Sequence, residues 1–321
     1  MKEILKVENL KKYFPVKKGI FSRVAGYVKA VDSVSLAINK GKVVGLVGES
    51  GCGKTTLGRT IIKLYEPSEG KIIFDNIDIT SMSRKRMRPL RKRIQYIFQD
   101  PYSSLNPRMT VLDIVGEGPV IHNIVKSNAE KRKLVENILN KVGLSEEHAD
   151  RYPHEFSGGQ RQRIGIARSM ALNPELIVCD EPISALDVSI QAQIINLLVD
   201  LKNEFDMSYL FISHDLKVVE YISDEVAVMY MGRLVEYALA PVLYSEPLHP
   251  YTLALIDAIP VIDKKTKSKK IFLQGDVPSP LNPPAGCPFH TRCAECIEKC
   301  RKETPELREV RKGHRVACHR R

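Results

Sequence analysis

Short apolar runs alternate with longer amphipathic stretches along this chain. Leu5–Leu10 and Val31–Ile38 alternate apolar with polar residues, which predicts half-exposed antiparallel strands. Three runs are apolar almost throughout and predict buried strands: Lys42–Val47, Leu176–Asp180 and Tyr209–Ile212. Two further predicted strands are Lys71–Phe74, after the turn Pro67–Gly70, and Ile94–Phe98.

Helical spacing separates these strands. Thr56–Leu64 and Gln191–Phe205 have it, and the pattern is helical from Thr110 to about Arg168. Within that stretch Ala129–Val142 is amphipathic, with Gly143 at the expected C-cap. The order of elements predicts an α/β core of mostly parallel strands, an N-terminal antiparallel sheet, a helical subdomain near residues 100–165 and a small C-terminal module.

One glycine-rich segment has the composition of a phosphate-binding loop. Gly48-Glu49-Ser50-Gly51-Cys52-Gly53-Lys54-Thr55, followed by Thr56, fits the template G-x-x-x-x-G-K-[ST] between a predicted strand and a predicted helix. Glycines let the backbone turn its N–H groups onto an anion, and the helix N-terminus adds partial positive charge. In such a loop Lys54 reaches the β- and γ-phosphates and the Thr55 hydroxyl ligates Mg²⁺. A glycine-rich turn without chemistry is the alternative.

Two later strands end in groups suited to phosphate chemistry. The run Leu176–Asp180 leads into Asp180-Glu181-Pro182, and the carboxyl ends of parallel strands are where an α/β sheet gathers its ligands. Asp180 is placed to hold Mg²⁺ through water, and Glu181 to orient or deprotonate an attacking water. His214 follows the strand Tyr209–Ile212, and we interpret it as a γ-phosphate contact; the alternative is a cap of the next helix.

Three other segments have two interpretations each. Ser157-Gly158-Gly159-Gln160 opens a helix without the lysine of a phosphate loop, so it is either a second anion site or a helix cap. Tyr13 or Phe14 either stacks on an adenine ring or packs on an edge strand. The basic run Arg84–Arg93 is interpreted as a solvated face.

Composition narrows the class of protein. The 321 residues are 43% apolar and 27% charged, as in an ordinary globular protein, and no apolar run approaches the ~18 residues of a membrane span. Met1-Lys2-Glu3-Ile4 does not begin a secretory signal, so we expect a cytosolic chain. The net charge of +11 suggests nucleic acid or an anionic surface, but residues 263–321 hold 15 Lys/Arg against 7 Asp/Glu, and this concentration in the tail weakens the nucleic-acid interpretation.

Five of the seven cysteines lie close together near the C-terminus: Cys287, Cys293, Cys296, Cys300 and Cys318. In a reducing compartment such a cluster is better explained by metal ligation than by disulfides. Zinc is the usual occupant, and Cys293-x2-Cys296 has the spacing of half a Cys₄ site. The other spacings are longer than those of paired zinc knuckles, so the identity of the metal stays open.

Together the motifs resemble the nucleotide-binding subunit of an ATP-binding-cassette transporter. The resemblance spans residues 5 to about 240 and rests on six motifs: the Walker A loop at 48–55, the glutamine loop at Gln99, the signature Ser157-Gly158-Gly159-Gln160, the Walker B end Asp180-Glu181, the D-loop Ser184-Ala185-Leu186-Asp187 and the switch histidine His214. The segment Ile97–Arg108, the motif His249-Pro250-Tyr251-Thr252 and the cysteine-bearing tail resemble the dipeptide/oligopeptide (and nickel) importer branch. One departure is Phe156 before Ser157, where many relatives have leucine.

The resemblance implies roles for these residues. Two such domains pair head to tail and bury two ATP molecules, so that Ser157 and Gly159 meet the γ-phosphate of the partner's ATP. The implied catalytic residues are Glu181, His214 and Gln99. Gln99 also belongs to the implied nucleotide-binding residues and to the implied Mg²⁺ ligands. The nucleotide set further comprises Tyr13, the whole loop Gly48–Thr56, Gly158, Gln160, Asp180 and Asp187, and Thr55 and Asp180 complete the Mg²⁺ set.

The resemblance also implies a function and an organisation. It implies that the chain is an ATPase subunit on the cytoplasmic face of the cell membrane and that it drives peptide import. The implied partners are two membrane permeases and an extracytoplasmic peptide-binding protein. The second ATPase of the complex is either a related cassette or a second copy of this chain. Residues 1–240 form the ATPase domain and 241–321 the C-terminal extension. Relatives associate the pattern Cys287, Cys293, Cys300, Cys318 with a [4Fe–4S] cluster, which leaves Cys296 as an extra thiol and zinc as the alternative.

Other functions are weighed against this one. A nickel or other small-solute importer ATPase belongs to the same family. A soluble cassette ATPase of translation or DNA repair usually carries two cassettes or a long coiled-coil insertion, and neither pattern is present. A nucleotide-binding protein without turnover is disfavoured by Glu181 and His214.

Overall fold

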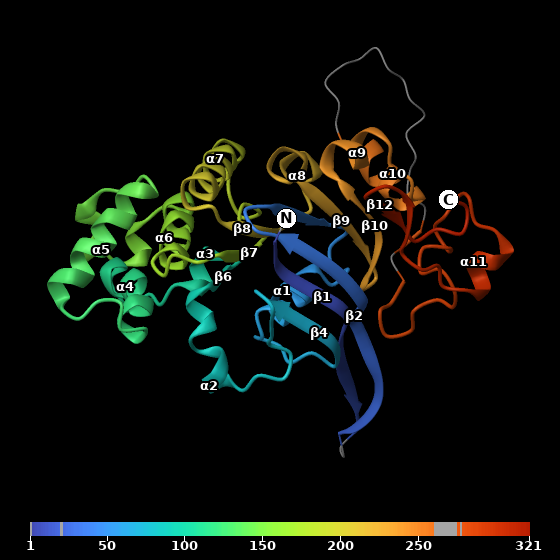
Figure 1. Ribbon diagram of the computed structural model, residues 1–321, viewed down its shortest axis with the longest axis horizontal. Coiled ribbons are helices and arrows are strands. Elements are labelled where there is room, and N and C mark those ends of the chain that lie inside the picture. The colour runs from blue at the N-terminus through green and yellow to red at the C-terminus, as the bar shows by residue number, and fades with distance from the viewer. Residues whose placement is uncertain (1, 20–21, 260–274, 277) are drawn as a thin grey trace, which may run out of the picture. The chain divides into compact units, whose positions relative to one another are not determined.

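A computed structural model describes residues 2–19, 22–259, 275–276 and 278–321 of the chain (Figure 1). Its segments cluster into two compact units. The first comprises Met1–Ile4, Ile38–Lys42 and Ser81–Ile212, and the second comprises Leu5–Ala37, Val43–Thr80 and Ser213–Arg321. Part of the positive charge noted for residues 263–321 falls on residues 263–274, which lie outside the described part of the chain.

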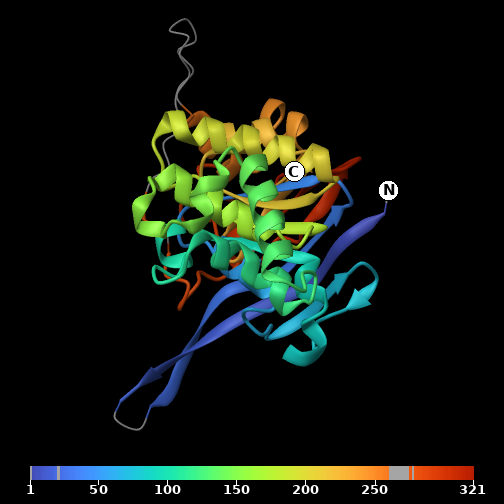
Figure 2. The same ribbon diagram turned by 90° about the vertical axis from the view of Figure 1, so that its left-hand side faces the viewer.

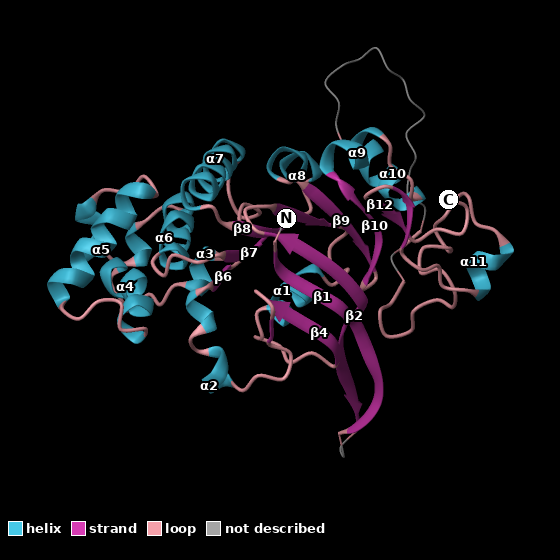
Figure 3. Cartoon of the chain, in the orientation of Figure 1, coloured by secondary structure: helices cyan, strands magenta, loops and turns pink. Residues whose placement is uncertain are grey.

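The first unit contains three parallel strands and most of the helices (Figure 3). Strand β7 (Leu176–Asp180) pairs with β6 (Ile94–Ile97) on one side and with β8 (Ser208–Ile212) on the other, and every residue of β7 and β8 is buried. Burial on both faces explains why these strands have continuous apolar runs instead of alternation. The helices are α2 (Arg84–Met87), α3 (Pro101–Ser104), α4 (Val111–Ile121), α5 (Asn128–Lys141), α6 (Gly158–Met170) and α7 (Val188–Phe205), and short 3₁₀ turns occupy Leu90–Lys92, Glu146–Asp150 and Pro153–Glu155.

Local sequence signals set the ends of the first unit's helices. Ser127 caps α5 by accepting a hydrogen bond from the Glu130 N–H, and Gly143 follows the helix with a φ of 74°, as predicted for a C-terminal glycine. Helix α7 begins three residues before the predicted Gln191, because the chain already turns helical after Asp187. In the basic run, Met87 and Leu90 are buried and most of the cations are exposed, which confirms a solvated face.

The second unit contains an antiparallel sheet with the strand order β2-β1-β4-β5. Its strands are β1 (Glu3–Lys18), β2 (Arg23–Asn39), β4 (Glu69–Phe74) and β5 (Ile77–Asp78). Figure 2 shows β1 and β2 (blue) running side by side as a long ribbon. We predicted only Leu5–Leu10 and Val31–Ile38 as strands, with a loop from Tyr13 to Tyr27. That prediction was too short, because the distal half of the ribbon is half-exposed or exposed at every residue from Lys11 to Lys18 and so lacks the alternation that marks a strand.

A second set of strands in this unit supports the phosphate loop. Strand β3 (Val43–Val47) is buried throughout and runs parallel to β9 (Glu225–Tyr230). Beyond β9 the pairing is antiparallel through β10 (Arg233–Leu239), β12 (His314–Val316) and β11 (Arg308–Arg311). The helices are α1 (Lys54–Ile61), α8 (Leu216–Ile222), α9 (Ala240–Ser245), α10 (Pro250–Asp257) and α11 (Glu298–Lys302).

A buried polar network ties the C-terminal segment to β10. The Glu236 carboxylate is fully buried and accepts hydrogen bonds from the backbone N–H groups of Leu248 and His249, at 2.7 and 2.9 Å. His314 Nε2, on β12, lies 2.7 Å from the same carboxylate. A buried carboxylate needs such hydrogen-bond partners. Glu236 therefore holds both the segment after β10 and strand β12 in place.

Candidate functional site

The predicted phosphate loop lies between β3 and α1 in the second unit. Gly48 has a φ of 154°, and a Cβ added there would lie 2.2 Å from the Met229 carbonyl oxygen. Gly53 has a φ of 109°, and its Cβ would lie 2.0 Å from the Ala30 carbonyl oxygen. Both positions therefore require glycine, and the loop's course is fixed by the packing of β2 and β9 around it.

Helix α1 begins as an anion site should. Its N-cap is Gly53, which has no side chain to cap the helix, as expected where a phosphate takes the place of a capping group. Lys54 is buried, and its Nζ donates to the carbonyl oxygens of Gly48 and Glu49 at 2.7 and 3.0 Å. Its ammonium therefore already lies inside the curve of the loop.

The remaining loop residues line the same turn. Ser50 and Gly51 are exposed, Thr55 and Thr56 are half-buried, and Cys52 is buried with its Sγ 4.0 Å from Lys54 Nζ. Burial raises the pKa of the Cys52 thiol, although the Lys54 ammonium acts in the opposite direction. Cys52 is therefore a packing residue of the loop, not a reactive thiolate.

Glu49 is held by the C-terminal segment, which the sequence did not reveal. Its carboxylate accepts two hydrogen bonds from Arg292, at 2.7 and 3.0 Å, and its backbone N–H donates to Tyr251 Oη at 2.8 Å. The Arg292 side chain is only 6% exposed, and the Glu49 carboxylate raises the pKa of its guanidinium. In the sequence, this contact is hinted at only by the motif His249-Pro250-Tyr251-Thr252, which indicates a family branch and not a partner of the phosphate loop.

The two aromatic candidates for adenine stacking have different surroundings. Phe14 packs edge-on against Tyr65, with ring centroids 5.5 Å apart. Tyr13 donates its hydroxyl to Asp32 Oδ1 at 2.5 Å, and Lys29 Nζ lies 5.8 Å from its ring centroid. Tyr13 is also bonded at its backbone N–H to Ser68 Oγ, at 3.0 Å, and its assignment as the stacking residue stays a prediction.

His214 lies between β8 and α8, and it does not cap α8. The cap is Asp215, whose carboxylate accepts hydrogen bonds from the N–H groups of Lys217 and Val218 at 2.9 and 3.3 Å. The alternative interpretation of His214 as a helix cap was therefore wrong. Its contact with a γ-phosphate stays a prediction.

The carboxylates predicted at the end of β7 lie next to two partners within the first unit. Asp180 is fully buried, and its Oδ2 accepts a hydrogen bond of 2.7 Å from Tyr96 Oη on β6. Glu181 has a φ of 46°, a strained conformation for a residue with a side chain. Its Oε2 accepts a hydrogen bond of 3.0 Å from Gln99 Nε2. The structure therefore brings together Gln99 and Glu181, 82 residues apart, as two members of the predicted catalytic set.

The predicted signature forms the start of α6. Ser157 Oγ accepts a hydrogen bond from the Gln160 N–H at 3.3 Å, and Gln160 Oε1 accepts one from the Ser157 N–H at 3.0 Å. The helix-cap interpretation is therefore confirmed for Ser157 and Gln160. Gly158 and Gly159 occupy the first turn of the helix. Contact with a partner's nucleotide is compatible with this geometry and stays a prediction.

The predicted D-loop leads into α7 with exposed residues. Asp187 is the N-cap residue of α7, but no hydrogen bond to its side chain caps the helix. Val188, the next residue, is 81% exposed.

Four C-terminal cysteines lie close enough for their charges to interact. Burial raises the pKa of the Cys287 thiol to about 11, and Cys300, Cys293 and Cys318 shift it in the same direction. Burial also raises the pKa of Cys293, with smaller effects from Cys318, Cys300 and Cys296. Among the residues that the structure describes, no three His, Cys, Asp or Glu side chains are grouped so that they could hold one metal ion.

Comparison with known proteins identifies the family. A model described as "ABC transporter" matches residues 31–184, and one described as "Oligopeptide/dipeptide transporter, C-terminal region" matches residues 235–300. The oligopeptide transport ATP-binding protein AppF of Bacillus subtilis (strain 168) is 54% identical over 98% of this chain and 97% of its own length. The chain belongs to the ATP-binding subunits of oligopeptide/dipeptide ABC transporters.

Other relatives agree with this assignment. A probable peptide ABC transporter ATP-binding protein of Sinorhizobium fredii is 49% identical over 98% of this chain and 89% of its own length. Among solved structures, the ATP-binding cassette MJ0796, a dimer bound to ADP and Pi, superposes with a TM-score of 0.66 at 29% identity, over 74% of this chain and 98% of that one. CbiO1 of Clostridium perfringens superposes with a TM-score of 0.65 at 31% identity, over 77% of this chain and 92% of that one.

The family match settles several predictions. The resemblance to the ABC peptide-importer ATPases is confirmed, and so are the ABC ATPase fold and the ATPase activity that the family implies. No helix among the described residues is long and apolar enough to cross a membrane. The roles of individual residues and the domain boundary at residue 240 stay predictions.

Proposed function

We propose that this chain is the ATP-hydrolysing subunit of an importer that couples ATP hydrolysis to the uptake of dipeptides or oligopeptides through membrane permeases. The observation that carries the proposal is that a C-terminal region of the oligopeptide/dipeptide transporter type follows an intact ATPase motif set in one chain. The relatives that it matches over nearly their whole length are named for oligopeptide or peptide transport.

In this proposal hydrolysis depends on electrostatic stabilisation and on placement of water. Lys54 and the N–H groups of the phosphate loop neutralise charge that develops on the transferred phosphoryl group. Glu181 accepts a proton from the attacking water or orients it, and Gln99, which is bonded to Glu181, positions that carboxylate. Mg²⁺, which Thr55 and Asp180 would hold, supplies charge neutralisation at the phosphates.

The tight bond between Asp180 and Tyr96 supports the proposed Mg²⁺ role. A buried carboxylate with no partner would be costly, and the Tyr96 hydroxyl donates a directed hydrogen bond of 2.7 Å to Asp180 Oδ2. This bond fixes the direction of the carboxylate. Asp180 therefore has a fixed direction from which to act on a hydrated cation.

We further propose that the chain works as one half of a cassette dimer at the cytoplasmic face of the membrane. The signature glycines in the first turn of α6, which carry no lysine of their own, support a second cassette as the source of the nucleotide that they contact. The related MJ0796 cassette is a dimer in its solved structure. A related second cassette, two permeases and a peptide-binding protein complete the assembly.

The test is reconstitution of the subunit with its permeases and second cassette in liposomes. We expect slow ATP hydrolysis by the isolated chain and a large stimulation when the permeases and a peptide-loaded receptor are present, with labelled peptide accumulating inside. Full activity of the isolated chain, unchanged by permeases, contradicts the transport role. Uptake of nickel but not of peptide would assign the complex to the nickel importers.

We also propose that Cys287, Cys293, Cys300 and Cys318 hold a [4Fe–4S] cluster. The four thiols are electrostatic neighbours, which fits a common ligand. In a [4Fe–4S] cluster each of four thiolates binds a different iron, so the long spacings between these cysteines suit a cluster better than the paired knuckles of a zinc site. When bound, the cluster would bridge distant parts of the C-terminal segment.

The metal content of the purified chain tests this proposal. Protein purified without oxygen is expected to be brown and to contain iron and acid-labile sulfide. A colourless protein with one zinc ion per chain decides for the alternative metal. If the cluster has a structural role, its removal should lower the melting temperature of the chain.

A further inference from the structure

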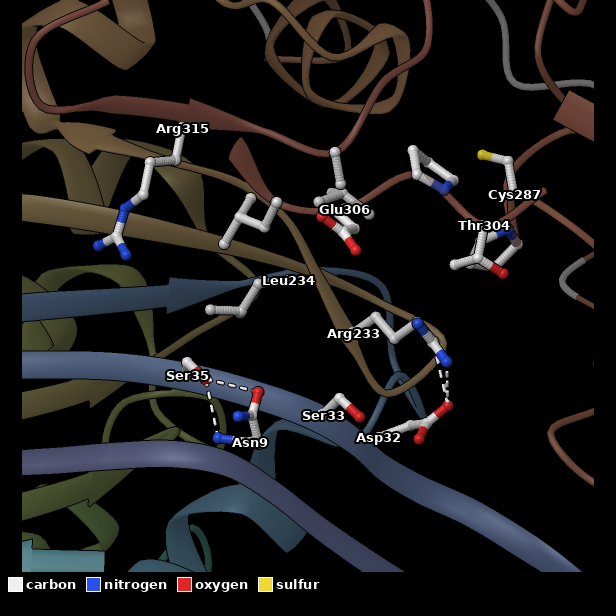
Figure 4. Close-up of a pocket in the computed structure, with 15 residues that line it drawn as sticks. Asn9, Asp32, Ser33, Ser35, Arg233, Leu234, Cys287, Thr304, Glu306 and Arg315 are labelled. Carbon is white, nitrogen blue, oxygen red and sulfur yellow. Dashed lines mark hydrogen bonds and ion pairs between the residues drawn. The ribbon is translucent and has the colours of Figure 1, made fainter. Parts of the chain in front are cut away.

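A polar cavity in the second unit is not used by the proposed ATPase chemistry. It has a volume of about 520 Å³, in the range of small-molecule sites. Its lining comes from β1 and β2, from β10, and from residues 287–317, as Figure 4 shows. The polar residues that line it are Asn9, Asp32, Ser33, Ser35, Arg233, Thr304, Glu306 and Arg315, and the thiol-bearing Cys287 lies at its edge.

Two of the four charged groups in the cavity neutralise each other. The Asp32 carboxylate accepts two hydrogen bonds from Arg233, at 2.6 and 3.0 Å, and a third from Tyr13. Bonding to Tyr13 and Arg233 outweighs burial, so the pKa of Asp32 is lowered and the carboxylate is ionised. This pair therefore leaves no net charge for a ligand to satisfy.

The other two charged groups are Arg315, which is half-buried, and Glu306, which is exposed to solvent, and neither forms an ion pair with another described residue. They do not pair with each other. The Arg315 guanidinium lies over the ring of Tyr237, 4.4 Å from its centroid, which holds it in place without neutralising its charge. Glu306 follows Pro305, and the neighbouring Thr304 is anchored by its hydroxyl bond of 2.9 Å to the Gly286 carbonyl.

Apolar side chains lie between the two unpaired charges. Figure 4 shows Leu234 on the wall between Arg315 and the Arg233–Asp32 pair, and Val235 and Leu307 also line the cavity. Asn9, Ser33 and Ser35 face them from β1 and β2 with amide and hydroxyl groups. The cavity thus offers one cation, one anion, an apolar surface and several neutral hydrogen-bonding groups.

We propose that this cavity binds a small zwitterion, a free amino acid or short peptide, whose carboxylate meets Arg315 and whose ammonium meets Glu306. A fatty acid would make no use of Glu306, and a diamine would make no use of Arg315. A phosphorylated ligand would bring its charge near two carboxylates with only one unpaired guanidinium to receive it. The apolar wall favours ligands with leucine-like side chains.

The experiment is calorimetric titration of the full chain with four probes: leucyl-leucine, its N-acetyl derivative, its C-terminal amide, and leucine. We expect leucyl-leucine to bind one molecule per chain. Acetylation, which removes the ammonium, should weaken binding roughly tenfold, and so should amidation, because each removes one charge-assisted contact. If leucine binds as well as leucyl-leucine, the natural ligand is an amino acid; if it binds much more weakly, the ligand is a peptide.

Variants tie each ligand charge to its residue. The Glu306→Gln variant should bind leucyl-leucine and its N-acetyl derivative with similar affinity. The Arg315→Gln variant should bind leucyl-leucine and its C-terminal amide with similar affinity. The matched controls are Arg301→Gln and Glu147→Gln, both exposed and outside the cavity, which should bind like the parent. Thermal melting of each variant verifies that it is folded.

Three outcomes overturn the proposal. The first is no binding of any probe at millimolar concentration by the folded parent chain. The second is binding of the acetylated and amidated probes as tight as that of leucyl-leucine itself, which shows that the ligand's charges are not recognised. The third is binding that Glu306→Gln and Arg315→Gln leave unchanged, which places the zwitterion elsewhere on the chain.

Discussion

Arg292 donates two hydrogen bonds to Glu49, so that a residue next to a proposed cluster ligand holds the phosphate loop. The contact joins positions 243 residues apart, and the arginine is almost fully buried. Glu49 is in turn fixed at its backbone N–H by Tyr251. The C-terminal segment is therefore part of the structure that shapes nucleotide binding.

The first prediction follows from this ion pair. Arg292→Ala leaves the Glu49 carboxylate uncompensated beside the place where phosphates bind, so ATP affinity should fall by about fivefold to tenfold. Titration with a fluorescent ATP analogue measures the change. Arg301→Ala, an exposed arginine with no described partner, is the control and should bind ATP like the parent chain.

A double variant separates charge from structure. In Arg292→Ala/Glu49→Gln the repelling carboxylate is gone, so most of the ATP affinity should return. If the double variant binds ATP as weakly as Arg292→Ala alone, the arginine acts by holding the loop's shape and the electrostatic explanation is wrong.

The second prediction concerns the base. Glu181→Gln should leave ATP affinity unchanged and lower the rate of hydrolysis about a hundredfold or more, since only the proton acceptor is lost. Lys54→Ala should instead weaken ATP binding itself, because it removes a contact that exists before the transition state. Nucleotide titration and phosphate release distinguish the two patterns. Turnover of Glu181→Gln near that of the parent would refute its assigned role.

The third prediction concerns the hydrogen bond from Tyr96 to Asp180. Tyr96→Phe should raise the Mg²⁺ concentration needed for half-maximal ATPase activity by several-fold, because the carboxylate loses the bond that directs it. ATP binding without Mg²⁺ should not change. Tyr209→Phe on β8 is the matched control, since it also removes a buried hydroxyl bond, here to the Leu198 carbonyl, away from the carboxylates. An equal shift in both variants would show a general loss of stability.

The fourth prediction concerns pH and His249. Burial lowers the pKa of His249 from 6.5 to about 3, so the folded chain keeps it neutral where the unfolded chain protonates it. The free energy of unfolding should therefore be highest above pH ~6.5 and fall toward pH ~3, by at most about 1.4 kcal/mol per pH unit from this residue. Urea denaturation at several pH values measures the slope.

His249→Asn isolates this contribution. In the parent chain the Tyr251 N–H donates a hydrogen bond of 3.0 Å to His249 Nδ1. Asparagine also offers an acceptor for this N–H, and its side chain does not titrate. The variant's stability should therefore depend less on pH than that of the parent. Identical slopes in both proteins would mean that other groups cause the acid sensitivity.

Much of the ATPase framework could be predicted because its signals are local. The phosphate loop has a fixed spacing, and the apolar run ending in Asp180-Glu181 marks a buried strand with its ligands at the carboxyl end. The partners Tyr96 and Arg292 could not be predicted, since they meet Asp180 and Glu49 only through folding across 84 and 243 residues. The distal half of strand β1, from Lys11 to Lys18, was missed for a different reason, because a strand that is half-exposed or exposed at every residue has no hydrophobic period.

The last prediction decides the ligands of the proposed cluster. Cys300, Cys293 and Cys318 all raise the pKa of the Cys287 thiol, and Cys296 is absent from that set; the Cys296 thiol lies 3.6 Å from the Ile297 carbonyl. Cys296→Ser should therefore keep the iron, the sulfide and the visible absorbance. Cys300→Ser should lose them, because Cys300 is buried and shares a backbone bond of 2.8 Å with Cys287. Both variants are purified without oxygen and assayed for iron and sulfide per chain. Reversed results would mean that Cys296 replaces Cys300 as a ligand, and loss in both would mean that all five cysteines are needed to build the site.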